Sequence, residues 1–137
     1  MRILALDPGT VRIGVAISDE LGVIAQPLEF IPAEPFGGLL ERLKQILSEK
    51  QVELILIGLP RNMDGSYGPA ALKVQEFVAV LRTAVATPIK TWDERLTSVQ
   101  ANRLLAEAHV RRDKRKGKVD QMAAAILLQS YLDSRAP

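Results

Sequence analysis

Five short segments along the chain have the length and apolar content of β-strands. Each is bounded by Gly, Pro, Asp, Asn or Ser, which end strands. The predicted strands are Ile3–Leu6, Arg12–Ser18, Val23–Ile31, Glu53–Gly58 and Ile89–Trp92. Pro27 lies inside the third, and because proline cannot donate to a strand ladder, we expect this strand at a sheet edge. The fourth is apolar at every position from Leu54 to Ile57, which predicts a central parallel strand covered on both faces.

Helical periodicity occupies the segments between and after the later strands. Apolar residues recur every three or four positions, with charged residues between them, in four places. The predicted helices cover Gly38–Lys50, Pro69 to about Val85, Thr97–Ala108, and Asp120 to about Leu132. A basic segment, Arg111–Lys118, interrupts the last two and is expected to be a loop.

This order of elements predicts an α/β fold with a five-stranded mixed sheet and helices on both faces. The first three strands form a meander, and the following strand–helix units add parallel strands. Right-handed crossovers place the fourth and fifth strands beside the first, opposite the meander, which gives the strand order 3-2-1-4-5. A chain of 137 residues is expected to form a single domain over residues 1–137.

Composition excludes several classes of protein. The chain has no cysteine, which excludes disulfides and thiolate metal sites. No apolar run approaches the roughly 20 residues that span a bilayer, and the N-terminus lacks the pattern of a signal peptide. We therefore expect a cytoplasmic protein without a membrane partner. The net charge of +2 indicates nucleic acid only weakly, so the distribution of charge matters more.

Four carboxylates are candidates for a shared site. Asp7 ends a buried strand, where a charge is costly unless it has a partner. Asp93 and Glu94 follow the fifth strand, and the predicted topology brings both strand ends to the same edge of the sheet, where α/β sheets bind ligands. Asp120 lies on the helical stripe of Ala124 that faces the sheet. Converging carboxylates hold Mg²⁺ or Mn²⁺, and two such ions can hydrolyse a phosphodiester.

Each carboxylate also has a simpler structural interpretation. Asp7 could only open the Pro8-Gly9 turn, and Asp120 could be a helix N-cap. Asp93 and Glu94 could be surface charges near Arg95. Because neighbouring residues on a strand point to opposite faces, at least one of this pair is expected to lie away from the site.

The basic segment Arg111–Lys118 contains six of the 18 Lys and Arg residues. Most charge runs are solvated loops, but Lys and Arg clusters also bind nucleic-acid backbones. This segment directly precedes Asp120, so it would overhang the proposed metal site, which favours nucleic-acid contact. The candidate contacts are Thr10, Arg12, Arg61, Arg95, Arg111, Arg112, Lys114, Arg115, Lys116 and Lys118.

Four motifs in this order resemble one family over nearly the whole chain. They are Asp7-Pro8-Gly9-Thr10, Gly58-Leu59-Pro60, Asp93-Glu94-Arg95-Leu96-Thr97 and Asp120-Gln121-Met122-Ala123-Ala124. The chain resembles the YqgF family, also called RuvX, which comprises small bacterial proteins with an RNase H-like fold. Members are described as pre-16S rRNA nucleases and sometimes as Holliday junction resolvases.

The resemblance implies a metal-dependent nuclease that matures the 5′ end of the small-subunit rRNA precursor, using Mg²⁺ or Mn²⁺ at Asp7, Glu94 and Asp120. Related resolvases carry an acid after the fourth strand, where this chain has Gly58-Leu59-Pro60. Asp93 is therefore a further candidate ligand. Two alternatives stay open: a resolvase of branched DNA, expected to act as a homodimer, and a non-catalytic factor that binds structured RNA during ribosome assembly.

Overall fold

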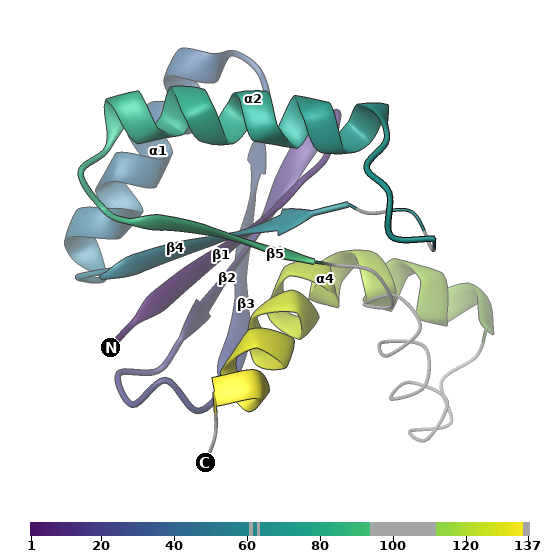
Figure 1. The fold of residues 1–137 in the computed structure, drawn as a ribbon. Helices are drawn as coiled ribbons and strands as arrows, with labels where there is room; N and C mark the ends of the chain where they lie inside the picture. Colours follow the sequence, from purple (N-terminus) through teal and green to yellow (C-terminus); the bar gives the residue numbers. More distant parts are fainter. Residues whose placement is uncertain (61, 63, 94–111, 136–137) are drawn as a thin grey trace.

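The structure, a computed structural model, describes residues 1–60, 62, 64–93 and 112–135, with the backbone alone described over 112–121. A five-stranded sheet in the order β3-β2-β1-β4-β5 forms its centre (Figure 1). The strands are β1 (Ile3–Pro8), β2 (Arg12–Ser18), β3 (Ala25–Pro32), β4 (Leu54–Leu59) and β5 (Ile89–Asp93). The described helices are α1 (Phe36–Glu49), α2 (Pro69–Ala84) and α4 (Arg112–Arg135).

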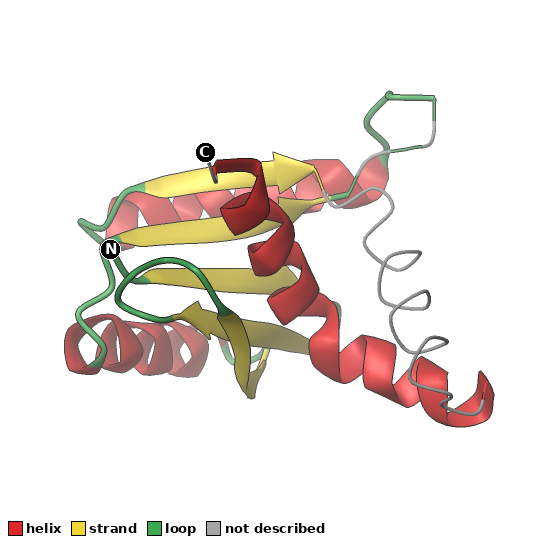
Figure 2. Ribbon diagram, turned by 90° about the horizontal axis from the view of Figure 1, so that it is seen from below, coloured by secondary structure: helices red, strands yellow, loops and turns green. Residues whose placement is uncertain are grey.

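The predicted topology is confirmed. β1 is central, pairs antiparallel with β2 and parallel with β4, and β4 pairs parallel with β5. Figure 2 shows α1 and α2 on one face of the sheet and α4 on the other. In the described part of the chain, no helix combines the length and the apolar character needed to cross a membrane.

Pro27 lies on the edge strand β3, as its missing N–H requires. The register with β2 shifts beside it, because Val15 pairs with Glu29 whereas Ala16 pairs with Pro27. Leu28 is therefore the extra residue of a bulge. The bulge keeps the rest of β3 in register on both sides of the proline.

The pleat of β1 divides its residues between two cores. Leu4 and Leu6 pack with α1 and α2, whereas Ile3 and Ala5 pack with α4. All four are fully buried. Because successive side chains on a strand point to opposite faces, Asp7 lies on the face covered by α4 and Pro8 on the face covered by α1 and α2.

The predicted start of the last helix is wrong. α4 begins at Arg112, so the basic segment is helical from Arg112 onward and is not a loop. Lys and Arg are good helix formers, and the single Gly117 costs only about 1 kcal/mol. Asp120 consequently lies well inside the helix, which excludes the N-cap interpretation. The helix predicted over Thr97–Ala108 lies outside the described residues, and the other boundaries differ by one to three residues.

The second half of α4 is anchored to the sheet by apolar packing and by one glutamine. Leu127, Leu128 and Tyr131 are buried against the sheet, as the helical stripe predicts. The Gln129 side chain accepts a hydrogen bond from the Ala25 N–H at 2.9 Å and donates to the Val23 carbonyl at 3.0 Å. These bonds hold α4 against the connection between β2 and β3.

An ion pair joins β3 to α1. The Arg42 guanidinium donates from Nη2 to Glu29 Oε1 at 2.6 Å and from Nε to Oε2 at 2.9 Å. Both side chains are partly buried. Hydrogen bonding from Arg42 lowers the pKa of Glu29, as a bidentate pair should.

We expect Glu29→Gln to lower the free energy of unfolding by about 1 kcal/mol at pH 7, since a partly exposed bidentate pair contributes modestly. A lowered folded-state pKa stabilises the protein above the unfolded pKa, and this contribution is lost as pH falls through the folded value. Urea unfolding of wild type and variant should therefore converge below about pH 4.

The control is Glu20→Gln, which removes the other ion pair between described residues. Arg2 meets Glu20 through one contact at 3.5 Å, and Glu20 is 84% exposed, so the change should be close to zero. Equal effects of the two substitutions would contradict a special role for Glu29.

Candidate active site

Asp7 lies between two glycines at the end of β1. Gly14 on β2 is its register partner, and Gly58 on β4 lies one residue beyond the last pair, Leu6 with Ile57. Asp7 is half-buried and Gly58 is buried. Neither glycine places a side chain beside the carboxylate.

Helix α4 crosses the sheet at this point. A Cβ built on Gly14 would lie 3.7 Å from Ala124 Cβ and 3.8 Å from Asp7 Cβ, so Asp7 and Ala124 meet on the same side of β2. Two small residues let the helix approach closely here. Position 120 precedes Ala124 by about one turn, roughly 6 Å along the axis, on the same helix face.

Asp93 is positioned differently from Asp7. It ends β5 in register with Leu59, which packs in the core under α1 and α2. The pleat thus assigns Asp93 to the face opposite Asp7. Trp92 is on the α4 face, where its ring meets Tyr131 edge-to-face at 5.1 Å. Trp92 is therefore a packing residue, as its strand position predicts.

Several predicted site residues cannot be placed with their side chains. Glu94, Arg95, Arg61 and Arg111 lie outside the described residues. Asp120 and the predicted basic contacts from Arg112 to Lys118 lie on the first turns of α4, which project beyond the sheet in Figure 2. Among the described side chains, no three acidic or histidine groups gather into a metal site.

Asp64 has a role in its own loop. Its Oδ1 accepts hydrogen bonds from the Ser66 hydroxyl at 2.6 Å and from the Ser66 N–H at 2.9 Å. The Ser66 bonds lower the pKa of Asp64. This carboxylate thus stabilises the turn after β4, and the described residues contain no other acid in the loop between β4 and α2.

The turn between β1 and β2 carries Thr10 and Arg12, two predicted nucleic-acid contacts, and both are exposed. Gly9 is required there, because a Cβ would lie 2.5 Å from the Arg12 carbonyl oxygen. The Arg12 guanidinium lies over the Phe30 ring, 4.0 Å from its centroid. Phe30 was not predicted as a site residue, and only the pairing of Gly14 with Phe30 brings it near Asp7.

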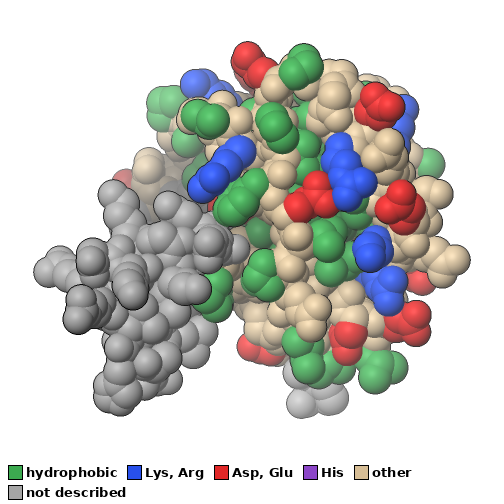
Figure 3. All heavy atoms as spheres, turned by 180° about the vertical axis from the view of Figure 1, so that it is seen from behind, with side chains coloured by type: hydrophobic (Ala, Val, Ile, Leu, Met, Phe, Trp, Pro, Cys, Tyr) green, Lys and Arg blue, Asp and Glu red, His purple; other side chains and the backbone are tan. Residues whose placement is uncertain are grey.

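On the face shown in Figure 3, the described side chains form no concentration of positive charge comparable with the basic segment Arg111–Lys118. Figure 3 shows basic and acidic side chains interspersed over the face opposite the view of Figure 1. Mixed charges attract a polyanion weakly. The densest run of Lys and Arg in the sequence instead lies at the start of α4, within about two turns on the N-terminal side of Asp120.

Comparison with known proteins identifies the family. Residues 1–134 match the family model described as RuvX, Holliday junction resolvase. The chain belongs to the RuvX family. A relative from Halothermothrix orenii is 50% identical over 133 residues, covering 97% of this chain and 95% of its own. One from Desulforamulus reducens is 50% identical over 136 residues, covering 99% of each. Both carry the name "Putative pre-16S rRNA nuclease".

Solved structures confirm the RNase H-like fold of this RuvX chain. RuvC of Thermus thermophilus, in complex with a Holliday junction substrate, has a TM-score of 0.56 and 16% identity, covering 98% of this chain and 96% of its own. The fowlpox virus Holliday junction resolvase has a TM-score of 0.56 and 14% identity, covering 98% and 99%. At such identities the likeness extends to the fold alone.

The close approach of α4 to β2 can be tested by substituting Gly14. Because a Cβ at this position meets its neighbours at 3.5 Å or more, Gly14→Ala should fit and raise the free energy of unfolding by up to about 1 kcal/mol. Gly14→Leu should lower it by about 1–3 kcal/mol through overpacking against α4. Urea unfolding measures both. A marked loss of stability in Gly14→Ala would contradict the distances of 3.5 Å or more around a Cβ at this position.

Proposed function

We propose that this chain is a metal-dependent nuclease that hydrolyses phosphodiester bonds in structured RNA, with the 5′ end of pre-16S rRNA as its substrate. The observation that carries the proposal is the position of Asp7. Asp7 lies at the carboxyl end of β1, between two glycines. Helix α4 crosses the sheet there at Ala124, one helical turn from Asp120. Membership of the RuvX family and the names of the relatives support the substrate.

The proposed ligands are Asp7, Glu94 and Asp120, since their carboxylate oxygens suit Mg²⁺ or Mn²⁺. Within the Asp93-Glu94 pair, the pleat of β5 favours Glu94, because Asp93 belongs to the opposite face. Bound metal ions would activate the attacking water and stabilise the leaving oxygen. We propose two ions, the number usual for this chemistry.

The chain's own residues would hold the substrate. The basic first turns of α4 project past the sheet and would bind the phosphate backbone near Asp120. Arg12, stacked on Phe30, would add a cation beside Asp7. Arg61, Arg95, Arg111 and Thr10 complete the proposed contacts. Backbone contacts of this kind do not depend on sequence, so the shape of the substrate would select the cleavage site.

Two other functions have specific support. The family description favours cleavage of a four-way DNA junction, which would need a homodimer to cut two strands. The basic residues at the start of α4 would equally bind RNA in a non-catalytic factor that acts in ribosome assembly. Since ribosomal precursors are processed where bacteria transcribe them, we propose a cytoplasmic location for either RNA function.

Asp7→Asn should reduce the rate of cleavage of a pre-16S leader RNA in Mn²⁺ by a hundredfold or more. A neutral amide is a poor metal ligand, and a bound ion stabilises the transition state by roughly several kcal/mol. The assay compares single-turnover rates on this RNA and on a four-way junction. Asp64→Asn is the matched control, since its carboxylate serves only the turn. Equal rates for wild type and Asp7→Asn would refute the site.

Replacing Arg112, Lys114, Arg115, Lys116 and Lys118 with Gln should weaken RNA binding. The slope of log affinity against log salt should fall by about 0.7 for each lost single-strand phosphate contact. Filter binding over a salt series measures this, with Lys44→Gln on α1 and Lys50→Gln directly after α1 as controls. A nuclease should cleave the RNA as wild type, and its Asp120→Asn variant should bind the RNA without cleaving it. A non-catalytic factor should bind the RNA and cleave it in neither form.

A further inference from the structure

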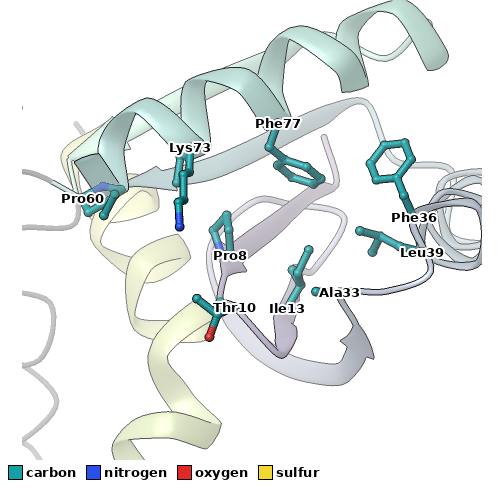
Figure 4. Close-up of a pocket in the computed structure, with 12 residues that line it drawn as sticks. Pro8, Thr10, Ile13, Ala33, Phe36, Leu39, Pro60, Lys73 and Phe77 are labelled. Atoms are coloured by element: carbon teal, nitrogen blue, oxygen red, sulfur yellow. The ribbon is translucent and has the colours of Figure 1, made fainter. Parts of the chain in front are cut away.

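A pocket of about 450 Å³ opens on the face of the sheet opposite Asp7. It lies between the turn after β1, the end of β4 and the facing sides of α1 and α2. Figure 4 shows Phe36 and Phe77 along its inner wall, with Pro8, Pro60 and Lys73 toward the strand ends. Its volume is that of an ordinary small-molecule site, roughly 300–1,000 Å³.

The pocket and the candidate active site share the end of β1, on opposite faces of the sheet. Asp7 and Pro8 are consecutive, and the pleat turns them to opposite faces of the same strand end. Gly9 and Thr10 also line the pocket. A nucleic-acid strand whose phosphate lies at Asp7 would therefore bring a neighbouring nucleotide across the β1–β2 turn to the pocket.

The pocket lining combines apolar walls with one cation. Phe36 and Phe77 pack edge-to-face with ring centroids 6.4 Å apart, and Phe36 is 39% exposed. Lys73 is the charged residue of the lining, and its amine points toward the turn in Figure 4. Within the described part of the chain, no carboxylate lies within ion-pair distance of Lys73.

We propose that this pocket binds an unpaired nucleobase next to the scissile phosphate, with Lys73 on an adjacent phosphate. The inference rests on the proposed nuclease function and specifies its substrate as a structured nucleic acid with an unpaired nucleotide beside the cut. Apolar and aromatic walls can bind any nucleobase, whatever its identity. An ammonium group is a good phosphate ligand. The Thr10 hydroxyl can donate to or accept from a base edge or a 2′-hydroxyl. A neutral apolar ligand would leave the cation unused.

The test uses an RNA hairpin with one unpaired 2-aminopurine, whose fluorescence falls when the base stacks. The Asp7→Asn protein keeps the RNA intact. We expect a saturable decrease in emission, and about tenfold weaker binding for Lys73→Ala and for Ala70→Trp. Ala70 is an exposed lining residue, so a tryptophan there should fill the pocket without disturbing the core. Lys44→Ala, also exposed, should bind as the parent does.

Equal affinity for a hairpin that is abasic at the unpaired position, or unchanged binding by Ala70→Trp at an unchanged melting temperature, would overturn the pocket assignment. Cleavage by wild type distinguishes the two proposals. If wild type cuts RNA and the Lys73→Ala and Ala70→Trp variants cut equally well, the pocket proposal fails alone. If no cleavage occurs but binding requires the unpaired base and Lys73, the nuclease proposal fails and the pocket remains.

Discussion

The close approach of α4 to β2 at Gly14 and Ala124 is the contact on which the candidate site depends. It brings a helix carrying an acid and a row of basic residues to the strand end that carries Asp7. Leu127, Leu128 and Tyr131 provide the apolar burial that holds the helix down, and Gln129 fixes where along the sheet it lies. A side chain much larger than alanine at Gly14, or one larger than Ala124 on the helix, would lift α4 away from Asp7.

The same constraint explains why glycine surrounds the carboxylate. Gly14 and Gly58 flank Asp7 on the two neighbouring strands. In a strand interior glycine weakens the sheet, so glycine on both sides gives up some stability, and at Gly14 it admits the close approach of Ala124. On the opposite face, Pro8 and the turn at Gly9 shape the pocket beneath Lys73. One strand end thus carries a proposed catalytic surface on one side and a proposed base pocket on the other.

Much of the fold could be predicted from local patterns. Alternating apolar strands, the placement of Pro27 and right-handed crossovers lead to the strand order that the structure has. The start of α4 could not be predicted, because Lys and Arg are common in both loops and helices, and the apolar stripe that marks the helix begins only near Asp120. Phe30 and the pocket were also missed, since both depend on which residues meet across the sheet and between helices.

The sequence by itself determined the elements, their order and the identity of the acidic and basic residues, because these follow from side-chain chemistry and short-range periodicity. Only the tertiary structure decided which face each residue of the strand ends occupies. The pleat separates Asp7 from Asp93 and Asp7 from Pro8, and such sidedness depends on strand register. Register is set by packing between segments far apart in the chain, which local sequence does not specify.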